Sequence, residues 1–361
     1  MSSTTATAAV NAASIAAAAS EHTATEHTAT EAAQSSMLAI TQTEYGSSEV
    51  LSLKSIDKPS IGADEVLIEV VAAGVDRGVV HLMTGMPYLL RLAGFGLRRP
   101  KNRVLGLEVA GEVIAVGTDV TRFAPGDQVM GIAKGSFAEY AAASQDKLTH
   151  KPDNVSFEHA AVSTISGITA LQALTTQGNV SAGEQVLVIG ASGGVGTFAV
   201  QIATALGATV TAVASGTKAE FVRSLGAAEV IDYTTTDLGD VHTEFDLIID
   251  VGGRNSIGKL RQILKSTGRL VIVGGEGGGR LTGGIGRQLR AALLSPFIKQ
   301  QLSFFLSSET LEYIEPVAEM VASGEITPAI GERRPLAETP EAIAVLEAGH
   351  ASGKIVIEVA R

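Results

Sequence analysis

The sequence predicts an α/β protein in two parts, a mostly β first domain followed by a doubly wound parallel sheet. Two observations support this prediction. Between residues 37 and 143, short apolar segments are separated by Gly, Pro or Asp, which is typical of a β-rich domain. After Gly183, continuous apolar segments alternate with helical ones, which indicates a parallel sheet covered on both faces.

The expected elements follow this order along the chain. Strands of the first domain are predicted at 37–43, 50–56, 65–73, 107–116, 128–132 and 136–143, and a helix at 158–177. In the second domain, strands are predicted at 185–189, 209–214, 229–231, 245–250 and 269–273, and helices at 196–206, 218–225 and 256–264. From about residue 310, a helix, a Pro-rich connection and a last strand at 354–359 follow.

Four segments result from this pattern. Residues 1–36 are mostly Ala, Ser, Thr, Glu and His, with no Lys or Arg. We expect this tail to be disordered, because it has too little apolar surface to offset the entropy of ordering. The β-rich domain is predicted at 37–165 and the parallel-sheet domain at 166–305, and residues 306–361 are expected to return to the first domain.

Composition limits the partners of the 361-residue chain. The net charge of −11 and the 4% of aromatic residues argue against nucleic acid. No apolar run approaches the roughly 20 residues that span a bilayer. We therefore expect no nucleic-acid or membrane partner, and a cytoplasmic location. The chain contains no Cys, which excludes disulfides, thiolate catalysis and Cys-ligated zinc.

The strongest motif is QVLVIGASGGVG at 185–196, in which an apolar strand runs into a glycine turn that opens a helix. Dinucleotide binding needs this context, because glycines allow a tight turn and a close approach of the backbone to a pyrophosphate. The helix N-terminus adds unpaired N–H groups for the phosphates. Ala191 replaces the first glycine of the usual triplet, and the alternative is a plain turn between strand and helix.

The end of the next strand indicates which dinucleotide is bound. An NAD site normally has Asp or Glu there, which binds the ribose 2′-hydroxyl. Residues 213–218 read VASGTK, which offers two hydroxyls and the Lys218 cation to a 2′-phosphate and no carboxylate to repel it. We therefore expect NADPH rather than NADH. The alternative for Lys218 is an ordinary solvated residue at the start of a helix.

Five motifs together carry a family resemblance: GASGGVG at 190–196, SGTK at 215–218, LGA at 225–227, IDY at 231–233 and LGLEVAGEV at 105–113. They resemble the zinc-independent quinone oxidoreductases of the medium-chain dehydrogenase/reductase superfamily, over about residues 37–361. The resemblance implies a GroES-like β-rich domain that a Rossmann domain interrupts. It also implies a homodimer and a small-molecule substrate.

The same resemblance assigns cofactor-binding residues in this chain. It places the pyrophosphate at the glycine turn, the 2′-phosphate and ribose near Lys218 and Tyr233, and the nicotinamide half near Thr169 and Phe304. The full expected set is Thr169, Ala191, Ser192, Gly193, Gly194, Val195, Gly196, Ser215, Gly216, Lys218, Tyr233, Gly252, Gly274 and Phe304.

Three positions depart from the family pattern. Zinc-using relatives have Cys at the position of Asp76 and His at that of Leu107, and quinone reductases commonly have Asn at the position of Asp76. Some members bind the 2′-phosphate with an Arg near the C-terminus. This chain has no Arg there, and His350 or Lys354 is the expected substitute.

The remaining chemistry is hydride transfer without a Lewis acid. A quinone or a conjugated C=C bond needs the least assistance, because it delocalises the incoming charge. Candidate catalytic proton donors are Asp76, His81 and Tyr88. Each has a structural alternative: Asp76 as the cap of a helix at 77–84, His81 as a packed or solvated residue, and Tyr88 as part of an apolar wall.

The leading interpretation is an NADPH-dependent, zinc-free reductase of quinones or α,β-unsaturated carbonyls. Two alternatives stay open. One is a zinc-free NAD(P)-dependent alcohol dehydrogenase, and the other is an NADPH-binding protein without catalytic activity.

Metal content provides the first test. Because the chain has no Cys and has Leu107 in place of a ligand, we expect no stoichiometric zinc in elemental analysis of the purified protein. Chelators should leave its activity unchanged. One zinc per chain would refute the prediction.

Overall fold

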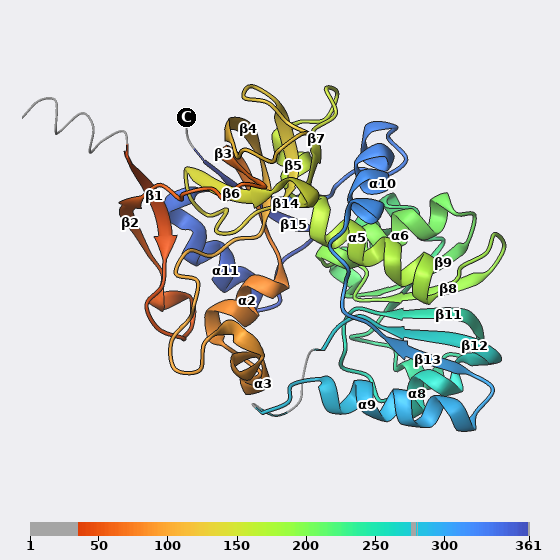
Figure 1. Ribbon diagram of the computed structural model, residues 1–361. Helices are drawn as coiled ribbons and strands as arrows, with labels where there is room; N and C mark the ends of the chain where they lie inside the picture. The colour runs from red at the N-terminus through yellow and green to blue at the C-terminus, as the bar shows by residue number, and fades with distance from the viewer. Residues whose placement is uncertain (1–34, 276–278, 280, 360–361) are drawn as a thin grey trace, which may run out of the picture.

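Two large sheets divide the molecule, one mostly antiparallel and one parallel (Figure 1). The computed structural model describes residues 35–275, 279 and 281–359. The predicted tail at 1–36 therefore lies outside the described residues except for Ser35 and Ser36, and Ser36 already belongs to the first strand. The predicted fold class, a GroES-like β-rich domain joined to a Rossmann domain, is confirmed.

A seven-stranded sheet organises the first domain, in the order β14-β15-β3-β4-β5-β7 with β6 paired to β3. Along β3, Val66, Ile68 and Val70 are buried and alternate with less buried residues, because one face of the sheet packs on the core. Strands β1 and β2 form a separate pair. The bounds are β1 Ser36–Thr41, β2 Ser52–Asp57, β3 Glu65–Val75, β4 Glu108–Val116, β5 Gln128–Ile132, β6 Tyr140–Ser144, β7 Leu148–His150, β14 Ile330–Pro335 and β15 Lys354–Glu358.

Short helices surround this sheet. Asp76 caps α2, because its carboxylate accepts the N–H groups of Gly78 and Val79, and Gly85 ends the helix in the left-handed region. The helical segments are α2 Arg77–Thr84, α3 Tyr88–Leu90, η2 Arg91–Phe95, α4 Phe157–Ala161 and α11 Thr339–Glu347, with single turns η1 Ser48–Val50, η3 Gln145–Lys147 and η8 Leu336–Glu338.

A six-stranded parallel sheet organises the second domain, in the order β10-β9-β8-β11-β12-β13. The strand order reverses between β8 and β11, and ligands of such sheets bind at the carboxyl ends beside this switch point. Its strands are β8 Gln185–Ile189, β9 Thr209–Ala214, β10 Glu229–Asp232, β11 Phe245–Asp250, β12 Leu264–Ile272 and β13 Gln301–Phe304. Its helical segments are α5 Thr164–Gln172, η4 Ala173–Gln177, α6 Gly194–Ala205, η5 Gly216–Lys218, α7 Ala219–Ser224, η6 Leu238–Asp240, α8 Ile257–Gln262, α9 Ile285–Leu294, η7 Ser295–Phe297 and α10 Leu311–Ala322.

The sequence pattern locates some elements better than others. Strands β8, β9 and β11 begin and end as predicted. The helix predicted at 158–177 is instead three pieces, α4, α5 and η4. The predicted connection before the last strand contains β14, whose charged residues (IGERRP) hide a strand pattern. The sequence pattern does not predict β7 and β13, because strands of three and four residues are too short to show a periodicity.

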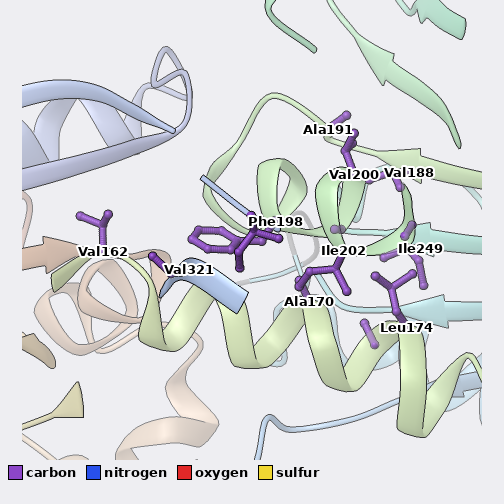
Figure 2. Close-up of a cluster of buried hydrophobic side chains, with 14 of the residues drawn as sticks. Val162, Ala170, Leu174, Val188, Ala191, Phe198, Val200, Ile202, Ile249 and Val321 are labelled. Carbon is purple, nitrogen blue, oxygen red and sulfur yellow. The ribbon is translucent and has the colours of Figure 1, made fainter. Parts of the chain in front are cut away.

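The largest core cluster joins the two domains. Figure 2 shows Phe198 of α6 among Val162, Ala170 and Val321, with Val188 and Ile249 of the parallel sheet nearby. The same cluster contains residues of the first domain, namely Ala72, Ala110, Met130 and Val356. The two sheets therefore share buried apolar surface, which favours one fixed arrangement of the domains.

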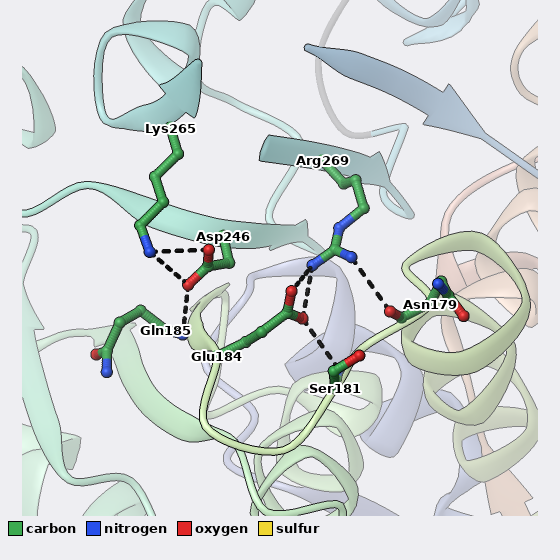
Figure 3. Close-up of polar contacts among 7 residues, drawn as sticks. All are labelled: Asn179, Ser181, Glu184, Gln185, Asp246, Lys265 and Arg269. Atoms are coloured by element: carbon green, nitrogen blue, oxygen red, sulfur yellow. Dashed lines mark hydrogen bonds and ion pairs between the residues drawn. The ribbon is translucent and has the colours of Figure 1, made fainter. Parts of the chain in front are cut away.

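A polar network closes the amino ends of β8 and β11 (Figure 3). Both carboxylate oxygens of Glu184 accept from one guanidinium nitrogen of Arg269 at 2.6 Å, and Arg269 also donates to the carbonyl oxygen of Asn179. Beside it, Asp246 accepts from Lys265 at 2.8 Å and from the N–H of Gln185 at 2.9 Å. Because this edge lies opposite the carboxyl ends of the strands, we assign the network to stability.

Removing one partner of the network tests this assignment. Glu184→Ala should lower the free energy of unfolding by about 1–3 kcal/mol, because the guanidinium of Arg269 loses its charged partner. Cofactor affinity should not change. The matched control is Glu220→Ala, whose 92% exposed side chain pairs with Arg223 on the surface and should contribute less than about 0.5 kcal/mol. Equal changes in urea unfolding for both variants would contradict the assignment.

Candidate functional site

The glycine turn lies at the carboxyl end of β8, beside the switch point. Gly190 has a φ of +83°, which a residue with a side chain rarely adopts. The N–H groups of Gly190 and Ala191 both donate to the carbonyl oxygen of Val213, at 3.2 Å. These hydrogen bonds attach the turn to β9. The usual motif has a glycine at the position of Ala191 to allow the tight turn, and in this chain Gly190 allows it instead.

The glycines after this turn have different reasons to be glycine. A Cβ at Gly196 would collide with the carbonyl oxygen of Gly190, so the fold itself requires glycine where helix α6 packs on β8. A Cβ at Gly193 would meet only that same oxygen, at an ordinary 3.5 Å. Gly193 caps α6 in an extended conformation that any residue adopts. The fold does not require glycine at position 193, whereas a closely approaching ligand does.

The C-terminal part of the first domain packs on the glycine turn. The N–H of Gly353 donates to the carbonyl oxygen of Ser192 at 2.8 Å, and Gly193 and Gly353 form a parallel bridge. The ammonium of Lys218 donates to the carbonyl oxygen of Ala351 at 2.9 Å. Partial burial lowers the pKa of Lys218. Lys218 and the glycine turn therefore both contact the loop at 351–353 that precedes β15.

A carboxylate from another strand lies beside the turn that follows β9. The Ser215 hydroxyl lies 3.1 Å from that of Thr217, next to Lys218 as predicted. However, a Cβ at Gly216 would collide with a carboxylate oxygen of Asp232, from the end of β10. Hydrogen bonds from the side chain and backbone of Thr234 lower the pKa of Asp232. Residues 213–218 contain no carboxylate, as predicted, but the neighbouring strand brings Asp232 beside Gly216.

The carboxyl ends of β11 and β12 complete the edge. Asp250 is buried at the end of β11, where it accepts from the N–H of Gly253 at 3.0 Å and pairs with Arg287 of α9. A Cβ at Gly252 would sit at an ordinary 3.4 Å from Ile189. A Cβ at Gly274 would collide with the carbonyl oxygen of Val251, so packing alone explains that glycine.

The other predicted cofactor residues are spread around this edge. Thr169 donates its hydroxyl to the carbonyl oxygen of Ile165 within α5. Tyr233, after β10, is exposed, and Phe304 ends the edge strand β13 with its ring partly exposed. No described contact joins these three side chains to one another, so their roles toward a cofactor stay predictions.

A buried charged cluster lies where the first domain meets α5. Lys354, with 2% of its side chain exposed, pairs with the completely buried Glu108 and donates to the Ser166 hydroxyl at 3.0 Å. The other carboxylate oxygen of Glu108 accepts the N–H of Ile165 at 2.7 Å. Lys354 therefore cannot bind a 2′-phosphate, as the sequence had suggested, because its ammonium is committed to Glu108.

Asp76 is the third charged member of this cluster. One of its carboxylate oxygens caps α2, and the other has no hydrogen-bond partner within the described residues. Burial and the nearby Glu108 raise the pKa of Asp76 to about 6, against the opposing effects of Lys354 and the two capping N–H groups. Asp76 can therefore hold a proton near neutral pH, as a proton donor requires.

The other two candidate proton donors lie apart from this cluster. A ring nitrogen of His81 lies 2.9 Å from the carbonyl oxygen of Met86, within the loop that follows α2. Tyr88 is partly exposed on α3, with the guanidinium of Arg91 above its ring. No described contact links either residue to Asp76, so the structure does not bring the three candidates together.

A cavity of about 460 Å³ opens beside Leu107, which directly precedes Glu108. Its walls are mostly apolar, and the polar side chains among them are Gln42, Lys101, Asn102 and Lys134. The lining residues are Gln42, Leu82, Gly94, Phe95, Pro100, Lys101, Asn102, Val104, Leu105, Gly106, Leu107, Lys134 and Gly135. All of them belong to the first domain, so the cavity is separate from the glycine turn.

Comparison with known proteins agrees with this arrangement. Residues 62–153 match an alcohol dehydrogenase GroES-like domain, and residues 225–357 match a zinc-binding dehydrogenase family. The chain is 34% identical to the mitochondrial NAD(P)H oxidoreductase RTN4IP1 of Mus musculus, over 91% of this chain and 90% of that protein. It is 32% identical to the 2-methylene-furan-3-one reductase of Solanum lycopersicum, over 90% and 79%.

Solved structures show the same relationship. The quinone oxidoreductase of Coxiella burnetii superposes with a TM-score of 0.80 at 30% identity, over 90% of this chain and 100% of that one. Mycobacterial Rv1454c, solved in complex with NADPH, gives 0.76 at 28% identity, over 89% and 99%. The chain belongs to the medium-chain dehydrogenase/reductase superfamily. As a member, it is an NAD(P)-dependent oxidoreductase.

The residues of this superfamily member fit a dinucleotide and do not fit zinc. The space above Gly193 and the cation of Lys218 suit a pyrophosphate and its neighbouring groups. At the position of the relatives' zinc, Leu107 offers no ligand atom. The described residues contain no group of three His, Asp or Glu side chains that could hold a metal. The cation beside Asp76 and Glu108 is the ammonium of Lys354.

Sequence reasoning missed four residues of the site: Glu108, Asp232, Asp250 and Arg287. Glu108 lies within the LGLEVAGEV motif, and Asp232 lies within IDY, so both were visible as family signals without an assigned role. Asp250 and Arg287 are 37 residues apart and meet only in the folded chain.

Replacing Asp76 by Asn tests the buried charge. The folded-state pKa of about 6 exceeds the ordinary value of about 3.9, so the folded protein is favoured while Asp76 is protonated and loses this advantage between about pH 4 and pH 6. Asp76→Asn, which keeps the cap, should match the wild type near pH 4. At pH 7 it should be more stable by about 1–3 kcal/mol.

Urea unfolding at several pH values between these limits measures the difference. The matched control is Asp57→Asn, at an exposed position on β2, which should show no such trend. A difference between wild type and Asp76→Asn that does not grow with pH would contradict the raised pKa.

Proposed function

We propose that this oxidoreductase uses NADPH, without zinc, to reduce quinones or α,β-unsaturated carbonyls. The observation that carries the proposal is the pair of features at the two sides of the site. On one side, position 193 is a glycine although the fold has room for a Cβ there. On the other, a mostly apolar cavity ends at Leu107, where zinc-using relatives have a ligand. Names of relatives support the substrate class, since they include a quinone oxidoreductase and a furanone reductase.

NADPH, when bound, supplies the hydride. The chain contributes positioning and charge. In this proposal, backbone N–H groups at the start of α6 would bind the pyrophosphate, and Ser215 and Lys218 would bind a 2′-phosphate. Asp232 opposes the same phosphate, so the preference for NADPH depends on Lys218 outweighing it. The alternative preference, for NADH, follows if Asp232 dominates.

On the substrate side, the chain would exclude water from the reacting groups and donate a proton to the substrate. The cavity walls of Phe95, Leu105 and Leu107 are suited to the apolar ring of a quinone. Asp76, which lies near Glu108, is our choice among the three candidate proton donors, because its raised pKa keeps it protonated at mildly acidic pH. A quinone or enone takes its remaining proton from solvent or from this group.

Two further expectations remain predictions. A homodimer is implied by the resemblance, and β13 at the edge of the parallel sheet leaves backbone groups available for a partner strand. A cytoplasmic location is the second expectation, whereas the RTN4IP1 relatives are named as mitochondrial proteins. No helix in the described part of the chain is long and apolar enough to cross a membrane.

Cofactor preference is tested at Lys218. Lys218→Ala should weaken NADPH binding by roughly ten- to a hundredfold, because one charge-assisted phosphate contact contributes about 1.5–3 kcal/mol. Binding of NADH should stay within about twofold of the wild type, since NADH carries no 2′-phosphate. Fluorescence titration measures both. Equal affinities of the wild type for the two dinucleotides would argue against the assignment, and the opposing variant Asp232→Asn should strengthen NADPH binding.

The proposed function is tested at Gly193 with a panel of acceptors. The wild type should oxidise NADPH with quinones and enones and not with simple aldehydes. Gly193→Val should fold, because a Cβ there meets only ordinary contacts. It should lose NADPH affinity by about a hundredfold or more, or about 3 kcal/mol, and lose turnover with it.

A thermal melt of the same sample provides the control for folding. A folded Gly193→Val protein that binds NADPH like the wild type would place the nucleotide elsewhere. Turnover only with alcohols or aldehydes would favour the alcohol dehydrogenase alternative. Cofactor binding without any turnover would favour a non-catalytic protein.

A further inference from the structure

Large apolar side chains are exposed on two segments near the cavity. In the first domain they are Leu92, Phe95 and Leu97, in and after η2, and Leu92 is 71% exposed. In the second domain they are Leu281, Leu289, Leu293 and Phe297, in and around α9, with exposures of 72% for Leu293 and 84% for Phe297. Single exposed leucines need no explanation, but two neighbouring groups of them indicate a binding surface.

Helix α9 packs Ala291 and Leu294 against the core and turns two other leucines outward. Leu289 and Leu293 are four residues apart, so they lie on one face of the helix, and both are exposed. The buried residue within α9 is the small Ala291. An ordinary surface helix buries its leucines against the core. The pattern in α9 is therefore that of a helix whose apolar face meets something outside this chain.

The two segments belong to different domains and meet in the folded protein. The N–H of Leu89 donates to the carbonyl oxygen of Leu281 at 3.3 Å. A Cβ at Gly283 would lie 3.1 Å from the ring of Pro87. Figure 1 shows α3 and α9 along the same lower edge of the molecule. We call the exposed residues of 88–103 and 281–299 the rim.

The charge of the rim is opposite to that of the chain. The chain has a net charge of −11, yet the segments 77–107 and 281–308 contain nine Lys or Arg residues and no Asp or Glu. Six of these cations are exposed and form no ion pair among the described residues. They are Arg98, Arg99, Lys101, Arg103, Arg290 and Lys299.

We propose that the rim docks on the surface of an anionic lipid bilayer. Exposed leucines and phenylalanines beside unpaired cations are what such a surface takes up, with the apolar groups at the acyl boundary and the cations at lipid phosphates. A second copy of the chain fits the rim less well. A two-fold contact centred on the rim would bring its cations together, and the rim has no acidic side chain to pair with them.

The inference concerns contact with a membrane surface, not insertion across it. The sequence-based expectation of no membrane partner depended on the absence of a spanning segment, which a peripheral contact does not need. Docking would hold the part of the cavity wall formed by Phe95 and Lys101 close to the bilayer. Under the proposed function, a quinone dissolved in the membrane then reaches the cavity without crossing water. Only this consequence of docking depends on the proposed function.

Sedimentation of the full chain with lipid vesicles tests the proposal, without cofactor or substrate. The probes are vesicles of phosphatidylcholine alone and of phosphatidylcholine mixed with phosphatidylglycerol, at low and high salt. One rim variant, Leu92→Ser/Leu293→Ser, removes apolar groups, and another, Arg98→Gln/Arg99→Gln, removes charge. Their matched controls are Leu38→Ser/Leu53→Ser, on the β1–β2 pair, and Lys54→Gln/Arg223→Gln, away from the rim.

The wild type should sediment with the mixed vesicles, less so at high salt, and not with pure phosphatidylcholine. Each rim variant should lose affinity by about tenfold or more, because each Lys or Arg at an anionic surface and each inserted leucine adds to binding. The controls should stay within about twofold of the wild type, and thermal melts should show that all five proteins are folded.

Three results would overturn the proposal. The first is a wild type that stays in the supernatant with anionic vesicles at low salt. The second is a rim variant that sediments like its control. The third is self-association through the rim, seen as a dimer that Leu92→Ser/Leu293→Ser converts to a monomer while neither protein binds vesicles. Because no turnover is measured, these results are independent of whether the proposed reaction is correct.

Discussion

The buried ion pair between Lys354 and Glu108 is the contact on which the arrangement of this molecule depends. Either charge alone in that interior would be strongly destabilising, so the two must stay together. Glu108 begins β4, Lys354 begins β15, and Ser166 of α5 accepts a hydrogen bond from the same ammonium. The pair therefore ties the chain end to the first sheet and to the helix that leads into the second domain.

The Lys354–Glu108 pair also fixes the position of the glycine turn. Directly before Lys354, Gly353 donates to Ser192, and two residues earlier the carbonyl oxygen of Ala351 accepts from Lys218. A shift of β15 would move both contacts. The shared core around Phe198 adds apolar surface to the same junction (Figure 2). The first domain and the glycine turn are consequently held in one arrangement.

The charges at this junction are carried by side chains of three different elements. Two carboxylates, Asp76 and Glu108, lie near one cation, Lys354, so the cluster is balanced only when Asp76 carries a proton. At the opposite edge of the parallel sheet, Glu184–Arg269 and Asp246–Lys265 are simple pairs with matched charge (Figure 3). The chain thus keeps its balanced pairs at the amino ends of the strands and its unbalanced acid near the expected site of reaction.

The sequence by itself determined the fold class, the glycine turn and most strands of the parallel sheet. Strand β8, the glycine turn and α6 are consecutive in the chain, so their local pattern contains the information that shapes them. Only the tertiary structure decided that Lys354 pairs with Glu108, 246 residues away, that Asp232 lies beside Gly216, and that Leu89 meets Leu281. These contacts depend on how separate elements pack, and local periodicity carries no information about which distant residue will be the neighbour.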